Sequence, residues 1–165
     1  MSTITTTHYG YSVRLPLPIE EAVVRVKGAF LAEGFGVLSE IDVRAKMQEK
    51  LAVEMESYVI LGMCNPRLAH QALTMEPEIG LMLPCNVIVY EQDGETIVSA
   101  QQPKLMLSVT GNATLTDVAA EADTRILQAL EEFNKLPRSK LRGITPTALA
   151  ALCEFVRIPA PLPDF

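Results

Sequence analysis

Two copies of the dipeptide Cys-Asn mark the points where this chain changes from one kind of secondary structure to another. Residues 58–63 are apolar and typical of a strand, which must end at Cys64-Asn65 because Asn65 and Pro66 predict the start of a helix. Asparagine is a strong N-cap, and proline is favoured at the first helical position. The second copy, Cys85-Asn86, opens another apolar strand. The helix between them is ended by Pro77 and Gly80, and Pro84 precedes the second strand.

Hydrophobic periodicity predicts the other elements along the chain. Helices are expected over 19–31, 45–55 and 115–133, and strands over 9–17, 35–43, 87–91, 95–100 and 105–109. In the short helix the apolar side chains Met47, Leu51 and Met55 are predicted to point inward. In the strand 35–43, alternation predicts that Glu40 and Asp42 point away from the core.

This order of elements predicts an α+β fold of two layers, with helices on one face of a mainly antiparallel sheet. Residues 1–136 are expected to form the domain. From residue 137 the composition changes, and 137–165 is interpreted as a C-terminal helical arm with a Pro-rich tail.

Composition excludes several classes of function. With 14 basic and 20 acidic residues the net charge is −6, the wrong sign for neutralising phosphates, so no nucleic-acid partner is expected. The longest apolar run, 79–89, is shorter than a membrane span and contains glycine and proline, so no membrane association is expected. The N-terminus has no signal-like apolar region, and the three cysteines are widely spaced, which together predict a cytoplasmic location.

Cys64 and Cys85 are the strongest candidates for chemistry, but their proximity depends on strand direction. If their strands are antiparallel neighbours, the two thiols meet at one edge of the sheet; if parallel, they lie a strand length apart. The helix starting after Cys64 predicts a lowered thiol pKa there. The alternative is that both are buried structural residues. His70 is not clearly aimed at Cys64 and no Cys-x-x-Cys pair is present, so no metal is expected.

Of the two asparagines beside the cysteines, the sequence gives a structural reason for one and not for the other. Asn65 is accounted for as a helix cap, whereas Asn86 stands in a strand, where asparagine is disfavoured, so a pairing edge, bulge or ligand contact would account for it. Glu40 and Asp42 share one strand face and are weaker candidates, as an acid–base pair. A solvated strand face is the alternative interpretation of those carboxylates.

The segments LGMCNP, from Leu61 to Pro66, and LMLPCN, from Leu81 to Asn86, resemble the hallmarks of the family catalogued as domain of unknown function 302. The similarity covers about residues 9 to 136. The resemblance implies a fold like the TATA-binding-protein class, with the order β-α-β4-α, and frequent homodimers, but no assigned activity. DNA binding does not follow from such a fold.

Two hypotheses of different class remain. The first is a small-molecule ligand or thiol site built from Cys64, Asn65, Cys85 and Asn86. The second is a noncatalytic homodimeric binding or assembly module in which the cysteines are structural. The sequence does not decide whether the protein is an enzyme, and it identifies no cofactor.

Overall fold

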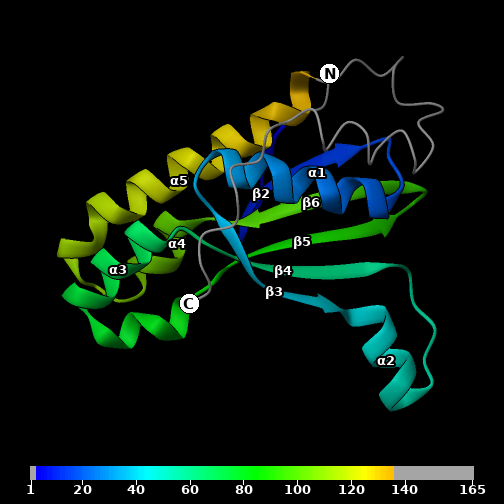
Figure 1. The fold of residues 1–165 in the computed structure, drawn as a ribbon, viewed down its shortest axis with the longest axis horizontal. Coiled ribbons are helices and arrows are strands. Elements are labelled where there is room, and N and C mark those ends of the chain that lie inside the picture. The colour runs from blue at the N-terminus through cyan, green and yellow to red at the C-terminus, as the bar shows by residue number, and fades with distance from the viewer. Residues whose placement is uncertain (1–2, 136–165) are drawn as a thin grey trace.

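The structure, a computed structural model, describes residues 3–135 (Figure 1). The predicted arm and tail over 137–165, together with Cys153, lie outside the described residues. The strands are β1 Thr5–Thr6, β2 Gly10–Leu15, β3 Gly36–Asp42, β4 Tyr58–Cys64, β5 Cys85–Gln92 and β6 Glu95–Gln101. The α-helices are α1 Ile19–Ala32, α2 Val43–Leu51, α3 Pro66–Met75, α4 Pro103–Ser108 and α5 Thr116–Glu131. Short 3-10 turns cover Pro77–Met82, Ala113–Leu115 and Glu132–Lys135.

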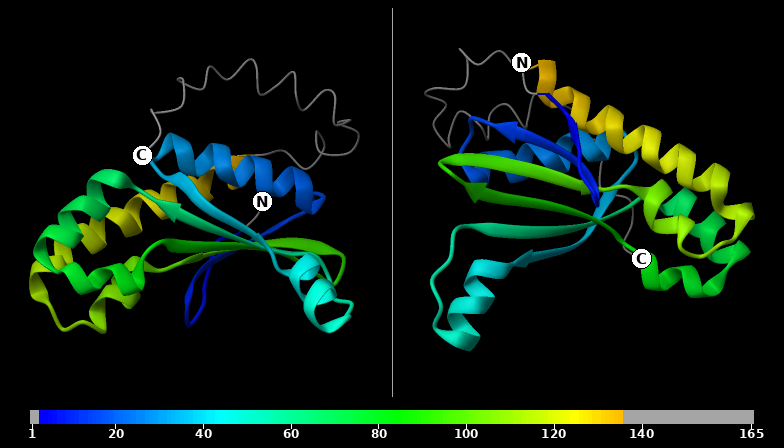
Figure 2. Two further views of the ribbon diagram at one scale, coloured as in Figure 1. Left: turned by 60° about the horizontal axis from the view of Figure 1, so that its bottom comes forward. Right: turned by 180° about the vertical axis from the view of Figure 1, so that it is seen from behind.

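The six strands form one antiparallel sheet in the order β1-β2-β6-β5-β4-β3. Both long helices, α1 and α5, lie on the same face of this sheet (Figure 2). The predicted α+β fold with helices on one face is therefore confirmed, while the finer likeness to the TATA-binding-protein class stays a prediction. Among residues 3–135, no helix is both long enough and apolar enough to cross a membrane.

The core is aliphatic and lies between the sheet and the two long helices. Val13, Leu61 and Val98 project from the strands toward Val26 on α1 and Ile126 on α5, and all five are at most 1% exposed. A second, smaller cluster fills the end of the domain where α3 meets α5. Its members are Leu68, Ala72, Ile79, Leu115, Val118 and Ala122. The candidate site lies at this end of the domain.

A β-bulge in β3 reverses the predicted orientation of its side chains. Val37 pairs with Met63, but Ser39 pairs with Gly62, so one extra residue is inserted between the two pairs. Side chains beyond the bulge therefore exchange faces, because a strand alternates with period two. Glu40, opposite the buried Leu61, points to the helix side of the sheet, and the prediction that it points away from the core was wrong.

Two further predictions were wrong. The apolar run 105–109, expected to be a strand, belongs mainly to helix α4, and proline at the first position, Pro103, favours that helix. Helix α2 has no buried residue: Met47 and Leu51, predicted to point inward, are exposed. In short apolar runs and short helices, hydrophobic periodicity is least able to distinguish a helix from a strand or a buried face from an exposed one.

Candidate functional site

The two cysteines lie at the same end of the sheet. Strands β4 and β5 are antiparallel neighbours, and Cys85 is the cross-strand partner of Met63, the residue before Cys64. Of the two geometries left open by the sequence, the antiparallel one is thus observed. Both thiols are free and partly buried.

A direct contact between the two sequence motifs explains one glycine and one proline in them. A Cβ atom on Gly62 would lie 2.4 Å from the Ser39 Oγ atom and 2.7 Å from the Pro84 Cγ atom, both too close for a real side chain. Glycine at this position therefore lets the proline of the second motif pack against the strand of the first. The motif pair describes two segments that are adjacent in space.

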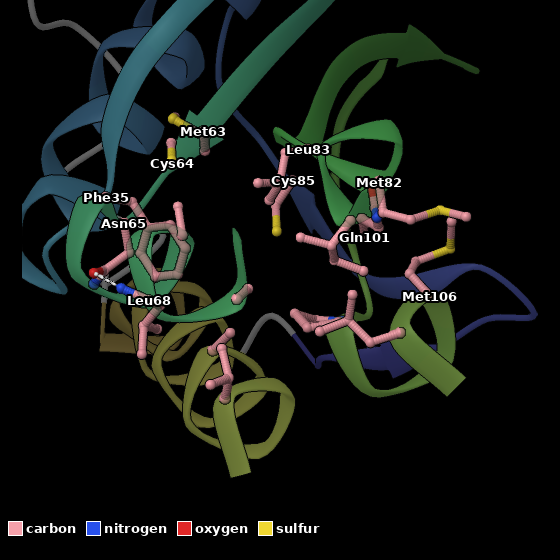
Figure 3. A pocket seen from close by; sticks show the side chains of 17 residues that line it. Phe35, Met63, Cys64, Asn65, Leu68, Met82, Leu83, Cys85, Gln101 and Met106 are labelled. Carbon is pink, nitrogen blue, oxygen red and sulfur yellow. Dashed lines mark hydrogen bonds between the residues drawn. The ribbon is translucent and has the colours of Figure 1, made fainter. Parts of the chain in front are cut away.

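Cys64 and Cys85 line one cavity of about 40 Å³, which also has walls from α3, α4 and α5. In Figure 3, Cys64 and Met63 lie on one side of the cavity. The Cys85 sulfur points into the cavity, between these two residues and Gln101. The remaining walls are mostly apolar. They are formed by Phe35, Asn65, Leu68, Ala69, Ala72, Ile79, Met82, Leu83, Pro103, Met106, Leu107, Val118 and Ala122.

None of the described residues that line this cavity is charged, and its two amide side chains, those of Asn65 and Gln101, each make a hydrogen bond. The Asn65 Oδ1 atom accepts a hydrogen bond from the Leu68 backbone N–H (3.2 Å), as expected of the cap of α3. The Gln101 Oε1 atom accepts one from the Asn86 backbone N–H (3.1 Å). The oxygens of both amides are therefore used for structure, and the two free thiols remain as candidates for contact with a ligand.

Burial determines the electrostatics of both thiols. It raises the pKa of Cys64, so the expectation that the helix N-terminus lowers this pKa was wrong. Burial, followed by repulsion from a charge on Cys64, raises the pKa of Cys85 to about 11. Since thiolate is the nucleophilic and metal-binding form, neutral pH keeps Cys85 in its less reactive form.

The other predicted site residues lie elsewhere. Asn86 is exposed and, opposite Gly62, shares the sheet face away from the cavity with Ile88. His70 is exposed on α3. Glu40 forms an ion pair with Lys27 of α1 (2.6 Å). Asp42 caps α2 by accepting a hydrogen bond from the Ala45 backbone N–H (2.8 Å), so each carboxylate has a local structural role.

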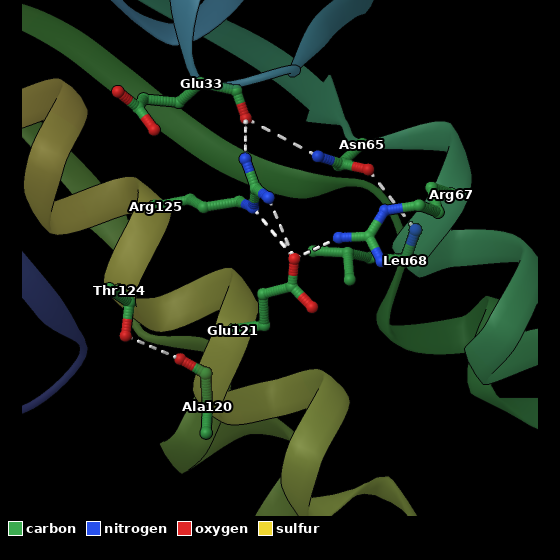
Figure 4. A network of polar contacts seen from close by, with 8 residues as sticks. All are labelled: Glu33, Asn65, Arg67, Leu68, Ala120, Glu121, Thr124 and Arg125. Carbon is green, nitrogen blue, oxygen red and sulfur yellow. Dashed lines mark hydrogen bonds and ion pairs between the residues drawn. The ribbon is translucent and has the colours of Figure 1, made fainter.

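A polar network beside the cavity holds α3 against α5 and the end of α1 (Figure 4). Glu121 on α5 accepts from both Arg125 (2.9 Å) and Arg67 of α3. Hydrogen bonding to Arg125, together with the nearby Arg67, lowers the pKa of Glu121. The backbone carbonyl of Glu33 in turn accepts from Arg125 (3.4 Å) and from Asn65 Nδ2 (3.5 Å). These contacts fix the helices that form the cavity wall.

A buried polar cluster escaped the sequence analysis. Asp123 on α5 is 2% exposed, and its Oδ2 atom accepts from the Tyr11 hydroxyl (2.9 Å) and faces Lys104 Nζ (3.3 Å). Gln102 donates a hydrogen bond to the same hydroxyl (3.0 Å). The cluster ties α4 and α5 to β2. One signal was available, because Asp123 stands one turn after Ala119, within the apolar stripe of its helix.

In residues 3–135, no group of three or more His, Cys, Asp or Glu side chains is placed to hold a metal ion. The fold and the site together define a small α+β protein with an apolar, thiol-containing cavity at one end of an antiparallel sheet.

The chain belongs to the family described as Domain of unknown function DUF302, whose sequence profile matches residues 11–133. It is also similar to the crystal structure of an uncharacterized conserved protein DUF302 from Bacillus stearothermophilus, with a TM-score of 0.71 and 30% identity. That match covers 76% of this chain and 98% of the Bacillus chain. No curated protein matches the sequence.

Proposed function

We propose that the cavity binds a small, neutral ligand and that Cys64 and Cys85 are its soft, polarizable contacts. The observation that carries this proposal is the composition of the wall: none of the described residues that form it is charged, and the side-chain oxygens of Asn65 and Gln101 already accept hydrogen bonds. A charged or strongly hydrogen-bonding ligand would lose its contacts with water without gaining equivalent ones. An apolar or weakly polar ligand meets no such cost.

The volume limits the size of the ligand. Sites for drug-sized molecules measure roughly 300–1,000 Å³, whereas one water in the liquid occupies about 30 Å³. A cavity of about 40 Å³ therefore suits a ligand of one to a few heavy atoms. The raised thiol pKa values favour binding over nucleophilic thiol chemistry, because little thiolate is present at neutral pH.

Xenon is a suitable probe because it is neutral, monatomic and apolar, and xenon is known to bind in apolar cavities. With methyl-labelled methionine, NMR spectra under xenon pressure should show shifts for Met82 and Met106, which line the cavity. The Met47 signal, from the exposed helix α2, is the internal control. Equal shifts at all three methyl groups, or none, would contradict the proposal.

Filling the cavity provides a second test. Ala122→Leu places three extra carbon atoms on a wall residue, so the xenon-induced shifts should disappear. Ala45→Leu makes the same change on the exposed α2 helix and should leave them intact. Persistent shifts in the well-folded Ala122 variant would place xenon outside the cavity.

The second candidate is a noncatalytic homodimeric module with structural cysteines. The observation that favours it is the set of large apolar side chains exposed on β3 and α2, including Leu38 and Leu51. Sedimentation of the double variant Cys64→Ser, Cys85→Ser separates the two ideas. An unchanged dimer that no longer responds to xenon favours the cavity, and loss of the dimer favours a structural role for the thiols.

A further inference from the structure

A hollow of about 260 Å³ lies on the face of the sheet away from α1 and α5. Two cross-strand partners, Ile88 of β5 and Ser99 of β6, line it. Asn86 and Tyr9 also line it, and none of the described residues in its wall is charged. The size of this open-face hollow is close to the lower limit for sites of drug-sized molecules, roughly 300 Å³, so it admits a larger ligand than the cavity does.

Asn86 is the residue in this hollow whose presence the fold does not explain. Asparagine is disfavoured in strands, yet Asn86 stands in β5, which is neither an edge strand nor bulged at this position. Its backbone N–H donates to Gln101 Oε1 (3.1 Å), but its side-chain amide has no partner among residues 3–135. The exposed amide therefore offers both a carbonyl acceptor and N–H donors, which favours the remaining explanation, a ligand contact.

Tyr9 lies across the hollow from Asn86. Its backbone carbonyl accepts a hydrogen bond from the Gln102 N–H (3.2 Å), which fixes the backbone here, while its side chain is 81% exposed. The next residue, Gly10, pairs with Gln101 of β6, and β6 is the neighbour of β5. Two strand spacings of about 4.8 Å, or roughly 10 Å, therefore separate Tyr9 from Asn86. A ligand that contacts both is about as long as one aromatic ring with a polar substituent.

We propose that the open-face hollow binds a small, neutral, planar molecule that carries an amide-like edge. The ring of the ligand stacks on the exposed Tyr9 ring. Its edge pairs with the Asn86 amide, because two carboxamides can each donate to and accept from the other. The ligand is neutral because the described wall offers no charge to pair with an ion, and the net charge of −6 disfavours an anion in particular.

This site is separate from the cavity, although the second Cys-Asn motif contributes to both. Successive residues of a strand point to opposite faces, so Cys85 lines the cavity and Asn86 lines the hollow. Gln101 and Met106, both labelled in Figure 3, line both spaces. Met82 lines the cavity and is not in the described wall of the hollow. The Met106 methyl group therefore reports on both spaces, and the Met82 methyl group reports on the cavity.

Benzamide is a suitable probe because it is a neutral, planar ring that carries a carboxamide. In NMR spectra of the full chain with methyl-labelled methionine, benzamide at up to about 20 mM, a concentration suited to so small a ligand, should shift Met106 and leave Met82 unchanged. Benzoate has the same shape but is charged and lacks N–H donors, and cyclohexanecarboxamide keeps the amide but is not planar. Each should bind at least about fivefold more weakly than benzamide.

Two substitutions test the contacts. Tyr9→Ala removes the stacking surface and Asn86→Ala removes the paired amide, so each should weaken benzamide binding by about fivefold or more. Gln92→Ala is the matched control, because it removes an exposed amide from the same strand outside the described wall of the hollow. Because the Tyr9 side chain is exposed, its variant keeps the test valid if Asn86→Ala fails to fold.

Several results would overturn the proposal. A shift of Met82 together with Met106 would place benzamide in the cavity instead of the hollow. The absence of any shift, equal binding of benzoate, or an affinity unchanged by Tyr9→Ala and Asn86→Ala would show that the hollow does not recognise this chemistry. An equal loss in Gln92→Ala would show that the response is not specific to the hollow. None of these results affects the cavity proposal, because neither Tyr9 nor Asn86 is in the described wall of the cavity.

Discussion

The Cys85 thiol should make the protein lose stability in alkaline solution. Its pKa in the folded protein is raised to about 11 from an ordinary value of 9.0, first by burial and then by Cys64. The folded state therefore favours the protonated thiol. The resulting stabilisation is fully present below about pH 9 and is lost as the pH rises through 11, because the unfolded chain deprotonates first.

The pKa shift gives the size of this effect. Two pKa units at about 1.36 kcal/mol each give roughly 3 kcal/mol of unfolding free energy at most. Urea unfolding measured in steps from pH 8 to pH 11 should show this loss in the wild-type protein. In Cys85→Ser, which has no thiol at this position, the slope should be shallower, so the two stability curves should converge as pH rises.

Comparison of the two proteins isolates Cys85 from other groups that titrate in this range. Burial also raises the pKa values of Tyr11 and Tyr58, and these tyrosines act equally in both proteins. Iodoacetamide labelling measures the same pKa independently, because only the thiolate reacts. At pH 8 the thiolate fraction of Cys85 should be about 100-fold lower than that of a thiol with a pKa of 9, so Cys85 should react about 100-fold more slowly. Identical pH slopes in the two proteins, together with ordinary labelling, would refute the reasoning.

Three other substitutions test the packing around the site by urea unfolding. Tyr11→Phe removes the hydroxyl that donates to buried Asp123 and should cost about 1.5–3 kcal/mol; an unchanged midpoint would show that the bond is replaced. Asn65→Ala removes the α3 cap and should cost about 0.5–2 kcal/mol, with lost helicity in circular dichroism. Gly62→Ala forces Pro84 aside and should cost about 1–3 kcal/mol, whereas Gly28→Ala, where space is open, should not destabilise.

The sequence predicted best where chemistry and periodicity agreed. Asn65 and Pro66 predicted the start of α3, and it begins there. Asp93 and Gly94, predicted as a hairpin turn, both have positive φ (55° and 77°), as the favoured two-residue turn requires. Such local signals act over a few residues and do not depend on the rest of the fold.

Predictions of which face of a strand or helix a side chain occupies were less reliable, because they depend on an uninterrupted pattern over many residues. The bulge between Val37 and Ser39 is invisible in the alternation pattern, and it alone moves Glu40 to the helix side. Asp123 was overlooked for a different reason, because its partners Tyr11 and Lys104 are distant in sequence and are brought together only by β2 and α4. Tertiary contacts of this kind leave no local periodicity.

The cavity follows from the way the two motifs end their strands. Cys64 and Cys85 are the last and first residues of neighbouring strands, so the sheet stops there and helices must close the core beyond it. Small residues at the facing helix positions, Ala72 and Ala122, cannot fill the space that the strands leave. If the cysteines served only to pack this end, larger side chains on these helices would close it more tightly, because interiors tolerate few voids. A cavity retained beside two thiols supports the binding proposal, and the xenon measurement on Ala122→Leu tests it.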